Sequence, residues 1–102
     1  MYLELEGFQV AKIEQGQNIL EQIQTHKPDL VFMDVHLKDA QGQEISGIDI
    51  LKHIRHDKVT SGIKVLMASG MDMGHECLQA GANGFLLKPF MPDELIAKIK
   101  NL

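Results

Sequence analysis

Hydrophobic positions along the chain follow two alternating patterns, one typical of buried strands and one typical of amphipathic helices. β-Prone segments occupy residues 8–13 (FQVAKI), 29–34 (DLVFMD), 62–70 (GIKVLMASG) and 84–90 (GFLLKPF). Each is followed by a segment with apolar residues at helical spacing, over residues 16–28, 46–57, 73–81 and 91–102. The pattern therefore predicts a strand followed by a helix, four times over.

Local signals support the helix limits. Ser46 precedes an apolar series at steps of three and is expected to cap the helix that follows. Gly81 is expected to end the third helix in a left-handed conformation, and Pro92 lies in the first turn of the fourth.

The alternation of strands and helices also predicts the fold. Short connections between such elements favour right-handed crossovers, a parallel sheet and helices on both faces. The 102 residues suffice for one domain with a real core. We therefore expect a three-layer α/β domain over residues 1–102.

Three polar residues follow the ends of predicted strands. Asp34, Ser69 and Lys88 come after the second, third and fourth strands. In open parallel sheets, sites form where the carboxyl ends of strands meet the following loops. We therefore expect a carboxylate, a hydroxyl and an ammonium at one edge of the sheet.

This combination of groups suits phosphoryl transfer onto the aspartate. Carboxylates serve as phosphoryl acceptors. The transfer depends on neutralising charge on the phosphoryl oxygens, which a lysine and a hydroxyl donor can do. The plain alternative is that Asp34 and Ser69 are turn residues and Lys88 a solvated charge.

Composition narrows the function classes. The formal charge of −4 and the scattered lysines give no basic face for nucleic acid. No apolar run could span a bilayer, and residues 1–7 lack the features of a signal peptide. The single cysteine, Cys77, fits a reducing cytosol and is interpreted as a core residue. A glycine-rich phosphate loop after a strand, expected of a cofactor-binding α/β domain, is missing from the sequence.

Four segments together resemble the receiver domain of bacterial response regulators, the CheY-like family of two-component systems. They are PDLVFMDVHL, SGIDILKHIR, KVLMASG and AGANGFLLKPF, in this order. The last is highly specific for the family, and the resemblance covers nearly the whole chain. It implies a flavodoxin-like fold with strand order 2-1-3-4-5.

The resemblance also implies roles for individual residues. Asp34 corresponds to the phospho-acceptor, and Ser69 to the hydroxyl that contacts the phosphoryl group and reorients in the active state. Lys88 corresponds to the family's lysine, joined to Pro89 by a cis peptide bond, and Phe85 to the switch aromatic. The Asp34 side chain and the backbone carbonyl of His36 correspond to two of the family's ligands of Mg²⁺.

The N-terminus departs from the family pattern. The family begins with a strand that carries a metal-binding acidic pair, followed by a full helix. Residues 1–7 match only the end of that helix, so Glu4 and Glu6 are interpreted as part of a helix remnant without a metal role. We expect a domain without its first strand, which must re-pair its sheet, borrow a strand from a second copy, or be part of a longer protein.

The segment between Asp34 and Gly47 is longer than is usual for the family. We interpret it, residues 38–46 in particular, as a tolerated surface insertion. The alternative is that Asp39 or Glu44 folds back and replaces a lost metal ligand.

The expected function is that of a cytoplasmic signalling domain, not a conventional enzyme. It would accept a phosphoryl group from a sensor histidine kinase or phosphotransfer protein and act on a protein partner through residues 75–100, without contacting nucleic acid or membranes. A homodimer formed by strand exchange is a further expectation. The alternative is an interaction or dimerisation module with the receiver fold that is not phosphorylated, because Mg²⁺ would lack its acidic pair.

Overall fold

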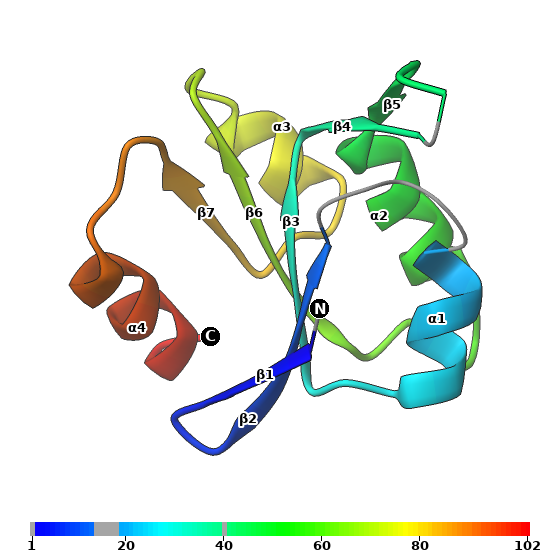
Figure 1. The fold of residues 1–102 in the computed structure, drawn as a ribbon, viewed down its shortest axis with the longest axis horizontal. Helices are drawn as coiled ribbons and strands as arrows, with labels where there is room; N and C mark the ends of the chain where they lie inside the picture. The colour runs from blue at the N-terminus through cyan, green and yellow to red at the C-terminus, as the bar shows by residue number, and fades with distance from the viewer. Residues whose placement is uncertain (1, 14–18, 40) are drawn as a thin grey trace.

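The computed structural model describes residues 2–13, 19–39 and 41–102, which form one sheet with helices on both faces (Figure 1). The five-stranded sheet contains β1 (Tyr2–Leu5), β2 (Phe8–Ile13), β3 (Leu30–Asp34), β6 (Lys64–Ser69) and β7 (Gly84–Leu87). A separate hairpin contains β4 (His36–Lys38) and β5 (Glu44–Ser46). The helices are α1 (Ile19–His26), α2 (Gly47–His56), α3 (Gly74–Gln79) and α4 (Pro92–Lys100).

The four predicted strand–helix units are confirmed. β3 is buried on both faces over Leu30–Met33, as its unbroken apolar run indicated. The Ser46 hydroxyl accepts a hydrogen bond from the amide of Asp49 at 3.3 Å and so caps α2. Gly81 follows α3 with a φ of +108°, and Pro92 opens α4.

The sheet re-pairs without a strand between β2 and β3. The strand order is β1-β2-β3-β6-β7, and β2 pairs directly with β3 in parallel, with Lys12 opposite Phe32 and Ile13 opposite Met33. In the family order 2-1-3-4-5, a strand separates these two, whereas in the part of this chain that the structure describes they are direct neighbours. Within this single chain, the sheet therefore adopts the re-paired arrangement.

The interpretation of residues 1–7 as a helix remnant is also wrong. Residues 2–5 form an edge strand that pairs antiparallel with β2 over four residues. Leu5 lies opposite Phe8, so Glu6 and Gly7 alone make the turn, with φ values of +51° and +83°. Positive φ at both central residues is typical of the tight turn that joins twisted strands, and Gly7 adopts it without steric cost.

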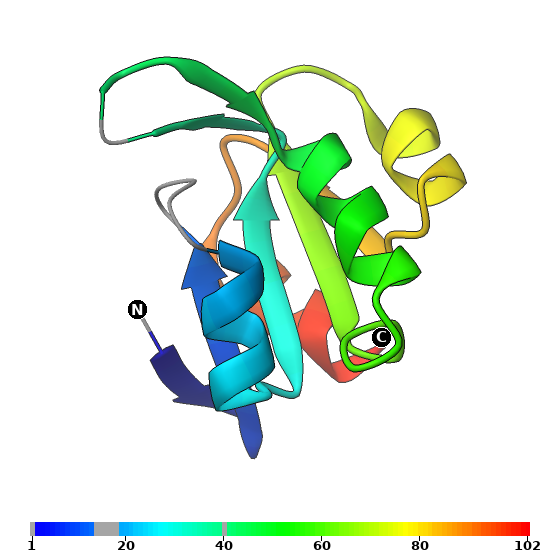
Figure 2. The ribbon, with the colours of Figure 1, turned by 90° about the vertical axis from the view of Figure 1, so that its right-hand side faces the viewer.

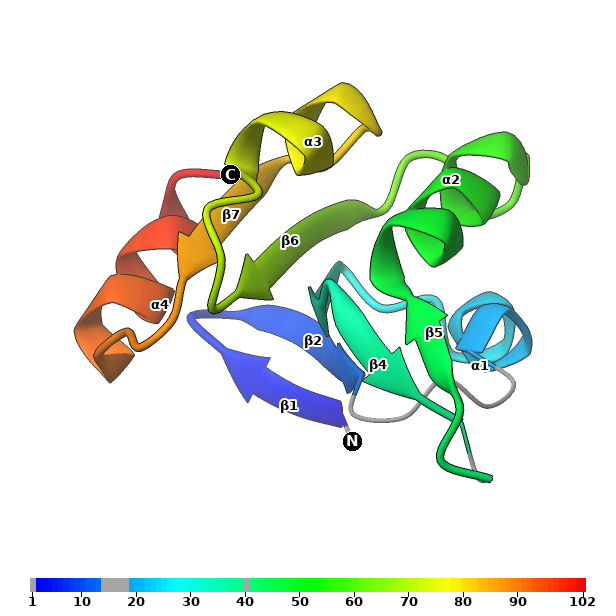
Figure 3. The same ribbon diagram turned by 90° about the horizontal axis from the view of Figure 1, so that it is seen from above.

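The order of the strands explains where the helices lie. The chain moves from β2 to β3, β6 and β7 in one direction, so right-handed crossovers place α1, α2 and α3 on the same face. Figures 2 and 3 show these three helices on one side of the sheet and α4 on the other. Each face has its own apolar cluster. The larger includes Ile23, Val31, Leu51, Ile54, Val65, Met67 and Cys77, and the smaller includes Val10, Leu30, Phe32, Leu66, Leu86 and Ile99.

The long segment after Asp34 forms the β4–β5 hairpin instead of an irregular loop. His36, Leu37 and Lys38 lie opposite Ser46, Ile45 and Glu44. Leu37 is buried and anchors the hairpin to the larger apolar cluster. The insertion thus lies at the surface, as interpreted from the sequence. It forms a regular hairpin there.

A half-buried arginine joins the loops at the amino edge of the sheet. The Arg55 guanidinium on α2 donates to the carbonyls of Ser61, Ile63 and Gly81 and to the side chain of Asn83, at 2.6–3.0 Å. Burial lowers the pKa of this guanidinium from its ordinary value. The planar group satisfies four acceptors at once, which a lysine could not do in the same geometry.

The start of α2 packs directly on the backbone of Asp34. Gly47 donates its amide to the carbonyl of Val35 at 2.6 Å, and a Cβ at Gly47 would lie 2.1 Å from the carbonyl oxygen of Asp34. Only glycine permits this approach, so the end of β3 and the first turn of α2 determine each other's position.

No described helix is both long and apolar enough to cross a bilayer.

We predict that Gly47→Ala destabilises the domain by about 2 kcal/mol or more, because the Asp34 backbone must move to relieve the clash. Chemical denaturation followed by circular dichroism measures the change. Gly62→Ala is the matched control, since a Cβ there meets nothing within 4 Å, and it should change stability by no more than about 0.5 kcal/mol. Equal effects of the two substitutions would contradict the packing argument.

Candidate functional site

The carboxyl ends of β3, β6 and β7 lie side by side at one edge of the sheet. β3 pairs with β6 up to Asp34 opposite Ala68, and β6 pairs with β7 up to Ser69 opposite Leu87. The amide of Val35 donates to the carbonyl of Ala68 at 2.9 Å, and the amide of Lys88 to that of Ser69 at 2.8 Å. These backbone bonds fix Asp34, Ser69 and Lys88 on neighbouring strand ends.

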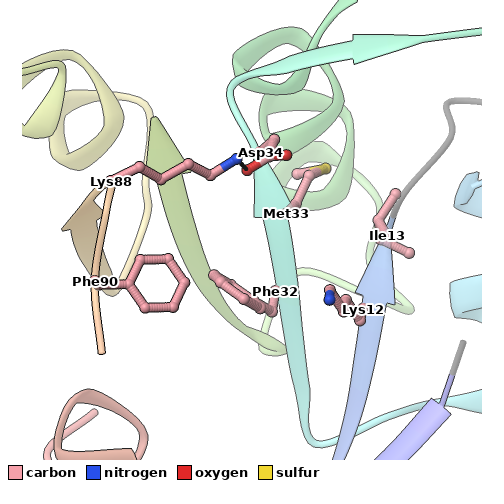
Figure 4. Close-up of a pocket in the computed structure, with 7 residues that line it drawn as sticks. All are labelled: Lys12, Ile13, Phe32, Met33, Asp34, Lys88 and Phe90. Atoms are coloured by element: carbon pink, nitrogen blue, oxygen red, sulfur yellow. Dashed lines mark ion pairs between the residues drawn. The ribbon is translucent and has the colours of Figure 1, made fainter. Parts of the chain in front are cut away.

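The structure brings the side chains of Asp34 and Lys88 into contact. The Lys88 ammonium lies 2.6 Å from Asp34 Oδ1, and the side chains are 43% and 37% exposed, respectively (Figure 4). At this exposure, the pair contributes at most about 1 kcal/mol to stability. Its chemical importance is that a carboxylate and its counter-charge both remain reachable from solvent. The Lys88–Pro89 peptide bond next to the pair is cis.

A cleft of about 290 Å³ opens beside this ion pair. Its lining comes from β2, β3 and the segment after β7 (Figure 4). Two lysines and one aspartate supply the charge, and the rings of Phe32 and Phe90, 5.9 Å apart and edge to face, supply much of the apolar wall. The complete lining is Lys12, Ile13, Phe32, Met33, Asp34, Lys88 and Phe90.

Ser69 and Phe85 lie on the other face of the sheet. Successive strand residues alternate between faces, so Ser69 shares the face of Met67 and Phe85 packs beside α3. The Ser69 hydroxyl is buried and accepts a hydrogen bond from the amide of Met71 at 3.1 Å. Phe85 is half-buried, and a Cβ at Gly74 would contact its ring at 3.4 Å. Neither residue lines the cleft that contains Asp34 and Lys88.

The His36 side chain is exposed, whereas its backbone is positioned by the hairpin. The bonds from Gly47 to Val35 and from Asp39 to Gln43 mark hydrogen-bonded pairs of the hairpin. Hydrogen-bonded and non-bonded pairs alternate in antiparallel ladders, so His36 and Ser46 form a non-bonded pair. The His36 carbonyl is therefore directed away from β5 and is available to another partner near Asp34.

The carboxylates of Glu6 and Asp39 have structural partners away from the Asp34–Lys88 pair. Glu6 lies in the β1–β2 turn at the amino edge of the sheet, where it pairs with Lys100 at 3.6 Å, and Glu4 lies next to this turn on β1. Asp39 accepts hydrogen bonds from the amides of Gln41 and Gln43 and so shapes the hairpin loop.

Glu44 is exposed on β5, on the same hairpin as Asp39. Within the described residues, no three His, Cys, Asp or Glu side chains gather in a way that could hold a metal ion. Asp39 is thus engaged within its own hairpin, and the fold-back alternative for Asp39 and Glu44 stays a prediction.

Cys77 is a core residue of α3, as expected. Its side chain is fully buried in the larger apolar cluster. Burial raises the pKa of the thiol, and the adjacent Glu76 carboxylate raises it further. Both effects disfavour the thiolate that a nucleophilic cysteine needs.

Sequence reasoning missed Lys12, Phe32 and Phe90 as parts of the site. Lys12 was visible as the single charge within the strand at residues 8–13, and Phe90 as the aromatic residue after the Lys88–Pro89 pair. The proximity of Lys12 to Asp34 depends on the direct β2–β3 pairing, which a strand-order argument based on the family could not supply.

The chain is similar to known proteins over most of its length. The family model of the response regulator receiver domain matches residues 1–100. The chain is 35% identical over 97 residues to the chemotaxis protein CheY of Bacillus subtilis (strain 168), covering 91% of this chain and 75% of that protein. It is 33% identical over 101 residues to the phosphate regulon transcriptional regulatory protein PhoB of Escherichia coli (strain K12), covering 96% of this chain and 42% of that protein. The chain thus spans less than half the length of PhoB.

A solved structure shows the same fold. The crystal structure of a response regulator from Chloroflexus aurantiacus J-10-fl matches with a TM-score of 0.74 and 34% sequence identity, over 87% of this chain and 71% of that chain. The chain therefore belongs to the response regulator receiver domain family of two-component signalling, whose members are signalling phospho-acceptor domains and not conventional enzymes.

Proposed function

We propose that Asp34 accepts a phosphoryl group from a phosphohistidine of a sensor histidine kinase or phosphotransfer protein. The observation that carries this proposal is the Asp34–Lys88 contact of 2.6 Å at the carboxyl edge of the sheet, with both groups partly exposed. A carboxylate there is accessible to a donor, and its neighbouring ammonium can stabilise the charge that moves onto the phosphoryl oxygens.

The transfer requires no redox partner. An Asp34 carboxylate oxygen attacks phosphorus as the phosphorus–nitrogen bond to the donor imidazole breaks. The bonding pair remains on the imidazole nitrogen, which takes up a proton, and Asp34 becomes an acyl phosphate. During this step, Lys88 exchanges its contact with the carboxylate for one with a phosphoryl oxygen.

The receiver family typically binds Mg²⁺, and two oxygen donors of the site fit this ion in kind. The Asp34 carboxylate and the His36 carbonyl, which is directed away from β5, would hold it. When bound, the ion would neutralise charge on the transferred group. Asp34 and His36 would orient the group relative to Lys88.

The response to phosphorylation would pass from Ser69 to Phe85. Ser69 is the last residue of β6, at the same edge as Asp34, and its hydroxyl accepts a hydrogen bond from the amide of Met71 in the following loop. If the hydroxyl turns toward a phosphoryl oxygen, the hydrogen bond between Ser69 and the amide of Met71 is lost. The start of α3 beside Phe85 can then move. Residues 75–100, which include α3, β7 and α4, would then present an altered surface to a protein partner.

A second candidate function is an interaction module that is not phosphorylated. It is favoured by one observation, namely that no three His, Cys, Asp or Glu side chains among the described residues gather in a way that could hold a metal ion. In this case, the Asp34–Lys88 pair would be a permanent structural contact, and a partner or a second copy would bind without a switch.

We predict that incubation with acetyl phosphate and Mg²⁺ adds one phosphoryl group to the chain and that Asp34→Asn abolishes the addition. Intact-mass spectrometry measures the result directly. Asp93→Asn is the matched control, because this carboxylate is exposed in the first turn of α4 and should not affect labelling. Retained labelling of the Asp34 variant would disprove the assignment, and a well-folded wild-type chain that takes up no label would favour the interaction module.

We further predict that Lys88→Ala remains able to take up label but loses the conformational response, since the contact that pulls on the end of β7 is missing. Amide hydrogen exchange over residues 71–90, compared between labelled and unlabelled protein, measures the response. The wild-type chain should show a change in protection and the variant little or none. An equal change in both would remove Lys88 from the switch.

A further inference from the structure

We infer that Phe90 is a positioning residue for Lys88. Its ring packs edge to face on Phe32 and thereby holds the segment after β7 where the Lys88 ammonium reaches Asp34. The inference deepens the proposed function, on which its consequence for phosphoryl transfer rests. Neither ring has a role in the transfer as described above.

The ring contact and the ion pair run in parallel across the sheet. Phe32 and Asp34 lie two residues apart on β3, so their side chains extend on the same face. Lys88 and Phe90 have the same spacing in the segment after β7. Figure 4 shows both of their side chains extending toward β3, where Lys88 meets Asp34 and Phe90 lies beside Phe32. Because β6 lies between β3 and β7, each contact spans the width of one strand.

The ion pair is too weak to fix the lysine by itself. Both of its side chains are partly exposed. Pairing at such a site gains little more free energy than the lost freedom of a long lysine side chain costs. The fraction of time that the ammonium spends at Asp34 therefore depends on where the backbone places Lys88.

The backbone after Lys88 has few hydrogen bonds of its own. The Lys88 amide donates to the carbonyl of Ser69 at 2.8 Å, and the next backbone bonds belong to the first turn of α4. Among the described residues, no hydrogen bond involves the backbone of Pro89 or Phe90. The Phe90 ring is thus the group that attaches this stretch to the sheet.

The ring contact has the geometry and burial that this role needs. The ring centroids are 5.9 Å apart at an interplanar angle of 65°, the edge-to-face arrangement that aromatic pairs prefer. Phe32 is 8% exposed and belongs to the smaller apolar cluster, so it offers a fixed surface. Phe90 is half-buried against this cluster and also lines the cleft that contains Asp34 and Lys88.

The ¹⁵N chemical shift of the Lys88 side-chain amine tests the inference without phosphorylation. Asp34→Asn removes the partner charge and gives the reference signal. We expect Phe90→Ala to move the wild-type signal most of the way toward this reference. Phe90→Tyr keeps the ring and should leave the signal unchanged. A wild-type signal in Phe90→Ala would overturn the inference, as would an equal movement in the alanine and tyrosine variants.

Leu95→Ala is the matched control. Leu95 on α4 is half-buried and packs against the same apolar cluster, so this substitution removes apolar contacts but retains both rings. It should leave the Lys88 signal unchanged. An equal movement in both alanine variants would reduce the effect to a general loosening of the cluster and refute the positioning role.

Phe90→Leu takes the place of the alanine variant if that variant does not fold. Leucine retains much of the apolar volume but not the ring edge, so it should move the Lys88 signal in the same direction. A wild-type signal in a folded leucine variant would then contradict the role of the ring.

A double-mutant cycle tests the consequence for phosphoryl transfer. Phe90→Ala should slow the uptake of label from acetyl phosphate about three- to tenfold, since the ammonium is less often at the carboxylate. In the Lys88→Ala background, the same substitution should have no further effect, because a residue that acts through Lys88 has nothing left to position. An equal loss in both backgrounds would make Phe90 independent of Lys88 and disprove the inference.

The outcome can be distinguished from the outcome for the proposed function. A chain whose Lys88 signal depends on Phe90 but that takes up no label retains the positioning role and loses the phospho-acceptor role of Asp34. A chain that is labelled on Asp34 but has the same Lys88 signal in the wild type and in Phe90→Ala retains the acceptor and loses the positioning role.

Discussion

The direct pairing of β2 with β3 is the constraint on which the rest of the structure depends. It leaves β3 flanked by β2 and β6, so all four residues before Asp34 are buried and the aspartate emerges at the end of a fixed strand. It makes the parallel strands run in sequence order, which places α1, α2 and α3 together on one face. On the other face, α4 covers only part of the sheet. The part beside Asp34 is open, and the cleft forms there.

Most elements could be predicted because their signals are local. The unbroken apolar run before Asp34, the cap at Ser46 and the glycine after α3 each follow from neighbouring residues alone. β1 was also signalled, since residues 3–6 (LELE) alternate apolar and polar side chains before Gly7. It was missed because the resemblance to a family whose first helix ends there outweighed a four-residue pattern.

The candidate site was predictable only to the extent that strand ends define it. Asp34 and Lys88 follow neighbouring parallel strands, and parallel strands bring such residues together whatever the side chains between them are. Lys12 and Phe90 depend on which strands are neighbours and on where the chain runs after Pro89. These are tertiary relations, and no spacing in the sequence encodes them.

The arginine at the amino edge has a mechanical consequence for the whole domain. Arg55 joins α2, the loop before β6 and the turn before β7 through four acceptors, at the end of the sheet farthest from Asp34. These hydrogen bonds hold α2, β6 and β7 together at the amino edge, so the same elements have more freedom to move at the opposite edge. The largest displacements of β6 and β7 must then occur at their carboxyl ends, so the fold concentrates movement where Ser69 and Lys88 lie.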